Sequence, residues 1–227
     1  MIPMKGSNDI CAPPAPPVHG AFVLSTASAF SKTRYTIADM LAALHRQRAL
    51  AGDTTYDKTF ATHIFHQCKF DFHSVCLPQE QLFAPMTREE YLLHRRREMK
   101  ELAEDAARAA LAHWGGDPTT ITHLYWGTMT GAMDSPTMDI YLATELNLSL
   151  DVKRTSVEGM GCLTGYRLLN LARETALGNP EARILVVSAD LRSMLGNLLP
   201  DKMSEPTSFP WPCSAMQHLQ RLLGRVL

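Results

Sequence analysis

Between residues 121 and 189 the sequence alternates short runs typical of strands with longer amphipathic ones, and this alternation restricts the fold more than any other feature. The runs 121–127, 152–157 and 183–189 are typical of strands, while 137–146 and the segment after Cys162 carry apolar residues at helical spacing. Strands that alternate with helices predict an α/β layer. Because the run 183–189 is almost wholly apolar, we expect this strand to be buried on both faces.

Further elements are expected nearer the N-terminus. A helix over 36–50 begins at a Thr cap and is followed by Gly52, and a longer helix over 88–113 ends at the sequence Trp-Gly-Gly. The apolar run 21–27 predicts a short buried strand. The arginines at 95–97 are consecutive, so on a helix they point in different directions, and we expect them to form a solvated helix end.

Length, composition and charge exclude several classes of protein. The chain has 227 residues, of which 45% are hydrophobic, and a formal net charge of -1, so it can bury one sizeable core. Balanced charge indicates neither a nucleic-acid surface nor a polybasic membrane patch, and we expect neither kind of partner. No apolar run approaches the roughly 18 residues of a membrane span and no secretory leader is recognisable, so the cytoplasm is the expected location.

Proline-rich stretches flank the predicted domain. Residues 12–17 read APPAPP, which favours extended polyproline geometry, so residues 1–17 are expected to form a flexible leader. Four prolines fall between 200 and 212, and they interrupt regular structure there. The predicted organisation is a leader (1–17), one folded domain (18–199) and a divergent Pro-rich tail (200–227).

Cys162 is the residue that most suggests chemistry. It follows Gly159-Met160-Gly161, at the start of the helix predicted after the strand 152–157. A sulfur at the first turn of a helix lies near unpaired N–H groups and the positive end of the helix dipole, which favour the thiolate. The glycines permit a sharp turn and leave room for an acyl group near the backbone. The alternative is a small apolar residue that fills a helix–sheet interface.

Several stretches, in this order, resemble the N-terminal half of type III polyketide synthases, the chalcone synthase family. They are EDAARAALAHWG from Glu104, ITHLY from Ile121, TGAMDSP from Thr130, VKR from Val152, Gly161-Cys162 and ARILVVSAD from Ala182. The resemblance runs from about residue 21 to residue 199. It implies the N-terminal half of a thiolase-type fold, an α/β architecture with a mixed sheet flanked by helices, in which the second half is absent.

The resemblance also implies an activity. In this family the cysteine that matches Cys162 is acylated by a CoA-linked starter, which is then condensed with malonyl-CoA units, so CoA thioesters are the expected substrates and no organic cofactor is expected. Thr130 matches a small hydroxyl residue that lines the family's cavity. The stretch 134–136 matches a loop that reaches across the interface of the family's homodimer, so a homodimer is expected here.

Parts of the family's machinery have no match in this chain. The family takes a catalytic histidine and asparagine from its C-terminal half and carries a Gly-Asp-Gly-Ala stretch after the strand that 183–189 matches; here the only histidine after Cys162 is His218. We therefore expect a truncated or remnant chain of uncertain turnover. Two alternatives stay open: a catalytically incompetent half-domain that dimerises with or regulates an intact relative, and a ketoacyl synthase or thiolase relative.

One cluster of potential metal ligands lies between residues 66 and 76. It comprises His66, Cys68, His73 and Cys76, whose spacing matches no common zinc pattern, and we expect no metal. In the family this region lies near the CoA entrance, where basic residues meet phosphates. Lys69 is the matching candidate, and its alternative is an ordinary solvated lysine.

Overall fold

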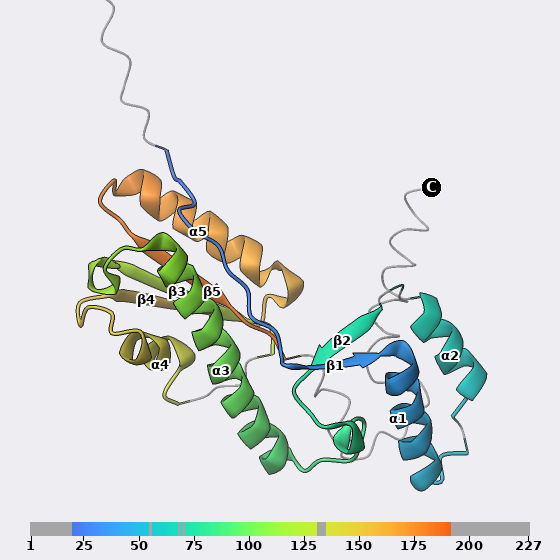
Figure 1. Ribbon diagram of the computed structural model, residues 1–227. Helices are drawn as coiled ribbons and strands as arrows, with labels where there is room; N and C mark the ends of the chain where they lie inside the picture. The colour runs from blue at the N-terminus through green and yellow to red at the C-terminus, as the bar shows by residue number, and fades with distance from the viewer. Residues whose placement is uncertain (1–19, 55, 68, 70, 131–134, 192–227) are drawn as a thin grey trace, which may run out of the picture.

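A parallel sheet of three strands forms the centre of the molecule, as the alternating pattern predicted. The computed structural model describes residues 20–54, 56–67, 69, 71–130 and 135–191. Within them the strands are β3 (His123–Thr128), β4 (Lys153–Glu158) and β5 (Ile184–Ser188), in the order β4-β3-β5 (Figure 1). All six residues of β3 are buried, as expected of a central strand.

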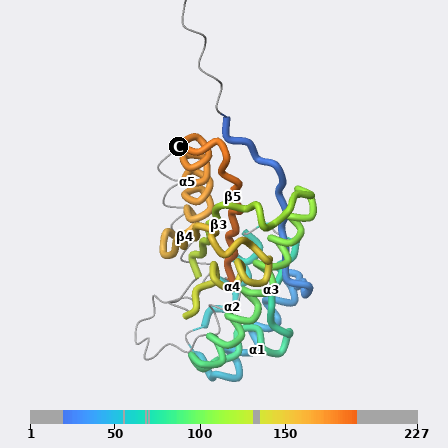
Figure 2. Tube along the Cα trace, turned by 90° about the vertical axis from the view of Figure 1, so that its left-hand side faces the viewer, coloured from blue at the N-terminus to red at the C-terminus, as the bar shows by residue number. Residues whose placement is uncertain are grey.

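Helices cover both faces of this sheet. Helix α5 (Thr164–Gly178) lies on one face, and α3 (Arg88–Trp114) and α4 (Met138–Glu145) lie on the other (Figures 1 and 2). Successive side chains of β3 alternate between the two layers. Tyr125 Oη lies 2.7 Å from Thr175 Oγ1 of α5, whereas Leu124 and Trp126 join the core on the α3 side.

The burial of β5 departs from the prediction. Leu185 and Val187 are buried in the main core, but Ile184 and Val186 are only half-buried. The face of β5 away from the main core is covered by α5 alone. Because β5 is also an edge strand of the three-stranded sheet, this face stays partly open. The expected burial on both faces is therefore right for one face and only partly right for the other.

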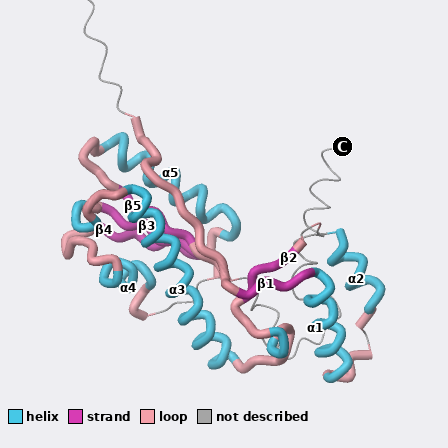
Figure 3. The backbone as a smooth tube through the Cα atoms, viewed as in Figure 1, coloured by secondary structure: helices cyan, strands magenta, loops and turns pink. Residues whose placement is uncertain are grey.

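A second group of elements packs beside this sheet. Strands β1 (Thr33–Thr36) and β2 (Phe72–Val75) pair antiparallel, and α1 (Ile37–Leu50) and α2 (Lys58–Gln67) lie next to them (Figure 3). Single 3₁₀ turns occur at η1 (Gln79–Gln81), η2 (Pro118–Thr120) and η3 (Gly161–Leu163). One continuous cluster of buried apolar side chains joins this group to the sheet, from Leu44 of α1 through Val75 to Trp126 of β3.

The helices α1 and α3 both begin at a capping threonine, as the sequence predicted for α1. Thr36 caps α1 through a capping box with Asp39, and Thr87 caps α3 through the same arrangement with Glu90. Gly115 ends α3 in the left-handed conformation, with φ 73°, which glycine adopts without steric cost. Both predicted helices are confirmed. None of the described helices is both long and apolar enough to cross a membrane.

The strand predicted at 21–27 is wrong. This segment forms no strand, and its apolar side chains are exposed, with Phe22 at 79%. It runs along α3 instead, where Ser25 Oγ donates a 2.8 Å hydrogen bond to the Ala110 carbonyl (Figure 1). An apolar run becomes a strand only where a neighbouring strand can pair with it, and none lies here among the described residues. The predicted leader 1–17 and tail 200–227 lie outside the described residues.

Candidate active site

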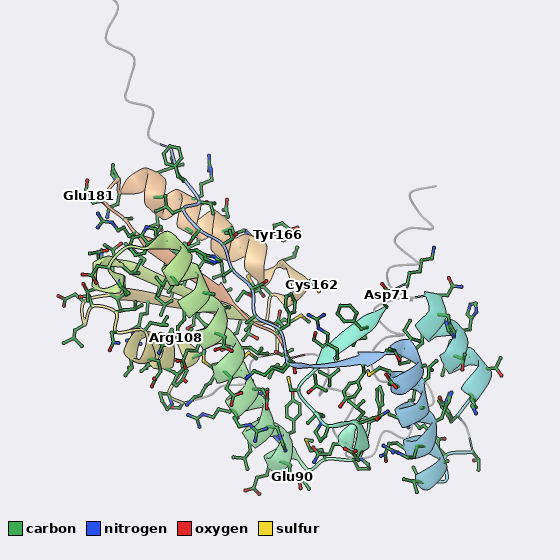
Figure 4. The ribbon with its side chains drawn as sticks, in the orientation of Figure 1. Asp71, Glu90, Arg108, Cys162, Tyr166 and Glu181 are labelled. Atoms are coloured by element: carbon green, nitrogen blue, oxygen red, sulfur yellow. The ribbon has the colours of Figure 1, made fainter. Side chains whose placement is uncertain are left out.

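Cys162 lies on the tight turn that connects β4 to α5. The turn is the 3₁₀ segment η3, so Cys162 precedes the first residue of α5 rather than forming part of its first α-helical turn. Gly159 and Gly161 have φ values of 75° and 59°, in the left-handed region where other residues are strained. The two glycines therefore provide the sharp change of direction that the sequence predicted. Figure 4 shows Cys162 at the N-terminal end of α5, with Tyr166 one turn further along the helix.

The Cys162 side chain is exposed, and the described residues give its sulfur no hydrogen-bond partner. It does not fill the interface between helix and sheet. Thr164 and Leu168 do so instead, with exposed fractions of 1% and 0%. The alternative interpretation of Cys162 as a packing residue is therefore wrong, and its thiol is accessible to a substrate.

The turn is held close to the central strand by a glycine. A β-carbon at Gly127 of β3 would come within 2.5 Å of Thr164 Cγ2 and 2.7 Å of Leu168 Cδ1. Only a residue without a side chain lets the first turn of α5 approach β3 this closely. Thr164 Oγ1 also donates a 2.8 Å hydrogen bond to the Gly161 carbonyl, which fixes the turn that carries Cys162.

Thr130 lies at the same edge of the sheet, in a buried hydrogen-bond network. Its N–H donates to Thr128 Oγ1 over 3.1 Å, and its own Oγ1 accepts the N–H of Leu191, also over 3.1 Å. Asp190 Oδ1 accepts from Thr128 Oγ1 at 2.9 Å and from the Met129 N–H at 2.7 Å. Because parallel strands end at the same edge, these segments after β3 and β5 lie at the same edge of the sheet as the Cys162 turn after β4.

Arg95 of α3 joins this network, which contradicts the prediction of a solvated arginine run. Its side chain is only 2% exposed, and Nη1 donates a 2.9 Å hydrogen bond to the Thr130 carbonyl. Burial raises the pKa of the neighbouring Tyr91, and the positive charge of Arg95 opposes that rise.

The sequence held a signal for the burial of Arg95. The buried residues of α3 recur every four positions and include this arginine: Tyr91, Arg95, Met99, Ala103 and Ala107. Residues at this spacing share one helix face, so the apolar stripe passes through Arg95. Arg97, two positions on, is exposed and pairs with Glu98 at 2.8 Å, as the prediction required.

Lys69 is exposed in the connection between α2 and β2, with φ 51°. It belongs to the β1–β2 part of the molecule, toward which the carboxyl edge of the sheet points (Figures 1 and 2). Of the four potential metal ligands, His66 lies in the last turn of α2, His73 lies on β2 and Cys76 follows it, while Cys68 is outside the described residues. In the described part of the chain no three metal-ligating side chains come together.

Residues 32–204 match the family model described as chalcone and stilbene synthases, N-terminal domain. The matched segment is more than half of the chain and includes Lys69, Thr130 and Cys162. The chain belongs to the chalcone and stilbene synthase family. This match confirms the resemblance read from the sequence.

Curated members of the chalcone and stilbene synthase family match a shorter segment. Type III polyketide synthase 21 of Oryza sativa subsp. japonica is 41% identical over 90 residues, which are 40% of this chain and 23% of that protein. Curcumin synthase 1 of Curcuma longa is 37% identical over 94 residues, 41% of this chain and 24% of that protein. The matched segments are therefore about a quarter of the length of these relatives.

Solved structures of type III polyketide synthases share the fold. The C-terminal type III polyketide synthase domain of Steely1, a type I/III hybrid from Dictyostelium, superimposes with a TM-score of 0.65 at 24% identity, covering 77% of this chain and 49% of that one. A fungal type III polyketide synthase, ORAS, gives 0.66 at 21% identity, covering 77% and 47%. The chain thus has the N-terminal fold of the family and spans about half the length of these structures.

In this chalcone and stilbene synthase domain the predicted site residues fall into two places. Cys162 and Thr130 both follow neighbouring strands at the carboxyl edge of the sheet, whereas Lys69 lies in the neighbouring β1–β2 part. Asp134, predicted to lie in a dimer-spanning loop, is outside the described residues. An open hollow of about 380 Å³ near Leu111, Pro118 and Asn147 is lined by none of the predicted site residues.

Proposed function

We propose that this chain carries out the acyl transfer of type III polyketide synthases, with Cys162 as the residue that carries the acyl group. The observation that supports this most strongly is the exposed Cys162 side chain on the glycine-flanked turn between β4 and α5, in a chain of the chalcone and stilbene synthase family. An accessible thiol at the start of a helix is the arrangement that acyl-transfer chemistry uses for a cysteine nucleophile.

In the proposed loading step, Cys162 Sγ attacks the thioester carbon of an acyl-CoA. A bond forms between that carbon and Sγ, the carbon–sulfur bond to CoA breaks, and the CoA thiolate takes up the proton that Cys162 released. In the extension step malonyl-CoA loses carbon dioxide, and the resulting carbon nucleophile attacks the acyl group on Cys162 and frees its sulfur. Acyl-CoA and malonyl-CoA are the substrates, and the proposal requires neither a metal nor an organic cofactor.

Thr130 and Lys69 have supporting roles in this proposal. Thr130 lines the space beside the acyl group, which its position after β3 at the carboxyl edge of the sheet supports. Lys69 contacts the phosphates of CoA, and its exposed side chain leaves the ammonium group accessible to such a ligand. The contact is electrostatic, so raising the ionic strength should weaken it.

Loading and chain extension both pass through oxyanions that need stabilisation. In the family a histidine and an asparagine from the C-terminal half serve this purpose, and each missing oxyanion donor removes about 3 to 4 kcal/mol of transition-state stabilisation. We therefore propose that the chain by itself loads an acyl group on Cys162 slowly, and that efficient loading and extension both require those two residues from a second unit. A reduced thiol suits a cytoplasmic location, where disulfides rarely persist.

The test is acylation of the full chain with an isotopically labelled acyl-CoA, followed by intact-mass analysis and peptide mapping. We expect one acyl group, located on Cys162 and absent from Cys162→Ala. Cys76→Ala is the matched control, because Cys76 is a described cysteine outside the site and its removal should leave the acyl group in place. An unmodified wild-type chain, or an acyl group on another residue, would refute the proposal.

A second candidate is a half-domain that dimerises with an intact relative or a second copy and regulates it. An exposed apolar surface around the start of α5 favours it, because Leu163 at the end of η3 and Tyr166 and Leu169 on α5 are 61%, 75% and 56% exposed. Adding malonyl-CoA to the acylated chain separates the two candidates. Acylation of Cys162 with little or no polyketide product from the chain alone supports the acyl-transfer proposal, whereas no acylation together with altered turnover of an added intact synthase supports the regulator.

A further inference from the structure

Arg95 is the most deeply buried charged side chain among the described residues. It is 2% exposed, although the other two arginines of the run, Arg96 and Arg97, are more exposed. Removing a guanidinium from water costs several kcal/mol, and the cost is tolerable only where fixed hydrogen-bond acceptors compensate for it. One such acceptor is the Thr130 carbonyl, 35 residues away along the chain and 2.9 Å from Arg95 Nη1.

Hydrogen bonds from three parts of the chain hold the backbone and the hydroxyl of Thr130. Its carbonyl accepts from Arg95 on α3, its N–H donates to Thr128 at the end of β3, and its Oγ1 accepts from Leu191 after β5. Thr128 Oγ1 donates its only proton to Asp190, so the 3.2 Å contact between the two threonine hydroxyls is donated by Thr130. Both the position of Thr130 and the direction of its hydroxyl are therefore defined.

This threonine ends its segment close to the cysteine turn. Thr128 on β3 pairs in register with Glu158 on β4, and both strands end there. Thr130 follows this pair by two residues after β3, and Cys162 follows it by four residues after β4. Thr164, two residues beyond Cys162, packs against Gly127 of the same strand β3. A displacement of the Thr130 segment would therefore change the surroundings of an acyl group on Cys162 without touching the thiol itself.

We propose that Arg95 is a positioning residue that holds the Thr130 segment and thereby sets which acyl group Cys162 accepts. This inference rests on the proposed function. Arginine suits the role better than lysine, because its planar group offers several donors in a rigid arrangement while lysine offers a single flexible ammonium. Arg95 acts through Thr130, and it takes no part in the bonds that form and break at Cys162.

The first measurement is positional and independent of activity. Hydrogen–deuterium exchange is compared between the wild-type chain, Arg95→Met and the matched control Arg97→Met, whose arginine is exposed on the same helix. In Arg95→Met the amides of Thr130 and Leu191 should exchange at least about tenfold faster, since a hydrogen bond to a charged group has been lost. Arg97→Met should match the wild type. Unchanged exchange in Arg95→Met would overturn the inference.

The second measurement concerns specificity. Initial rates of Cys162 acylation are compared for a short and a long acyl-CoA, next to the rate of alkylation by iodoacetamide, which needs no cavity. Arg95→Met should change the ratio of the two acylation rates by roughly tenfold and leave alkylation within about twofold. Arg95→Lys should give an intermediate ratio, and it also serves if Arg95→Met does not fold. Equal changes in alkylation and both acylations would mean a merely structural role and would refute the inference.

A double-mutant cycle tests the route through Thr130. If the Thr130 side chain passes the effect of Arg95 on to the acyl group, Arg95→Met should have little further effect on the acylation ratio in a Thr130→Ala background, although the Thr130→Ala variant keeps the carbonyl that Arg95 binds. Full additivity would contradict the inference. A wild-type chain that is never acylated would instead refute the proposed function together with the claim on specificity, and hydrogen exchange would then decide the positioning claim alone.

Discussion

Gly127 and Thr164 are so close that a β-carbon on the glycine would lie 2.5 Å from the Thr164 methyl carbon. The contact joins the central strand to the first turn of α5, two residues after Cys162. It shows that the position of the cysteine turn depends on the absence of a side chain at residue 127.

We therefore expect Gly127→Ala to lower the free energy of unfolding by about 1 to 3 kcal/mol, because a methyl group forced into a packed interface shifts its neighbours. The shift should displace the Cys162 turn and change its alkylation rate. Gly165→Ala is the control, since nothing lies within 4 Å of a β-carbon there and alanine favours a helix. Urea unfolding measures the stability of the two variants. Equal stability of Gly127→Ala and the wild type would disprove the close approach.

Leu168 and Leu169 are neighbours on α5 with opposite environments. Leu168 is 0% exposed against the sheet, whereas Leu169 is 56% exposed on the outer face. Leu168→Ala should therefore cost about 2 to 5 kcal/mol of stability, and Leu169→Ala less than about 0.5 kcal/mol. Thermal and urea unfolding of the two variants check this difference. Similar losses in both would show that the outer face of α5 is covered in solution.

Tyr141 and Glu104 join α4 to α3 through a hydrogen bond of 2.6 Å. Burial and this bond raise the pKa of Tyr141 to about 12, and the bond also lowers the pKa of Glu104. Since the folded-state pKa of Tyr141 exceeds its unfolded value, its contribution is complete below about pH 10 and is lost as the pH rises toward 12. The contribution of Glu104 has the opposite sign and is lost as the pH falls below about 4.

Tyr141→Phe should lower stability at pH 7 by about 1 kcal/mol, a value kept small because solvent screens this partly exposed pair. The difference from wild type should narrow above about pH 10 and below about pH 4. Unfolding free energies measured across this range provide the check, with Tyr166→Phe, on an exposed ring, as a control that leaves stability at pH 7 unchanged. A constant difference across the range would mean that the bond does not form in solution.

Asp139 ties α4 to β4. Its carboxylate is 6% exposed and accepts hydrogen bonds from Arg154 Nη1 at 3.0 Å and from Ser156 Oγ at 2.8 Å. Asp139→Ala should cost about 2 kcal/mol, because the partners lose a charged acceptor, and Asp139→Asn should cost less, since it keeps one acceptor oxygen. The exposed Asp151→Ala should change stability by less than about 0.5 kcal/mol. Chemical denaturation that ranks the three variants otherwise would contradict this account.

Local signals in the sequence were sufficient for much of the fold. The helices α1 and α3 begin at threonine caps and follow their apolar spacing, and β3, β4 and β5 coincide with the predicted strand runs to within a few residues. The glycines around Cys162 also predicted its turn. Each of these signals acts between residues close together in the chain, so it is present in the sequence pattern before any tertiary contact forms.

Other elements depended on partners that the pattern does not reveal. The short, partly polar strands β1 and β2 exist because they pair with each other across almost 40 residues, while the more apolar run 21–27 has no strand beside it and stays irregular. A strand needs hydrogen-bond partners from elsewhere in the chain, so its apolar composition alone is insufficient.

The amino-acid sequence by itself thus determined the family, the order of strands and helices in the parallel layer and the place of the cysteine between β4 and α5. Only the tertiary structure decided that Arg95 is buried on the Thr130 carbonyl and that Cys162 is exposed while Thr164 and Leu168 fill the interface. Whether a side chain is buried depends on which other parts of the chain pack against it, and these parts are often distant in the sequence. A charged residue is stable inside only where those surfaces supply acceptors, and a local pattern does not record them.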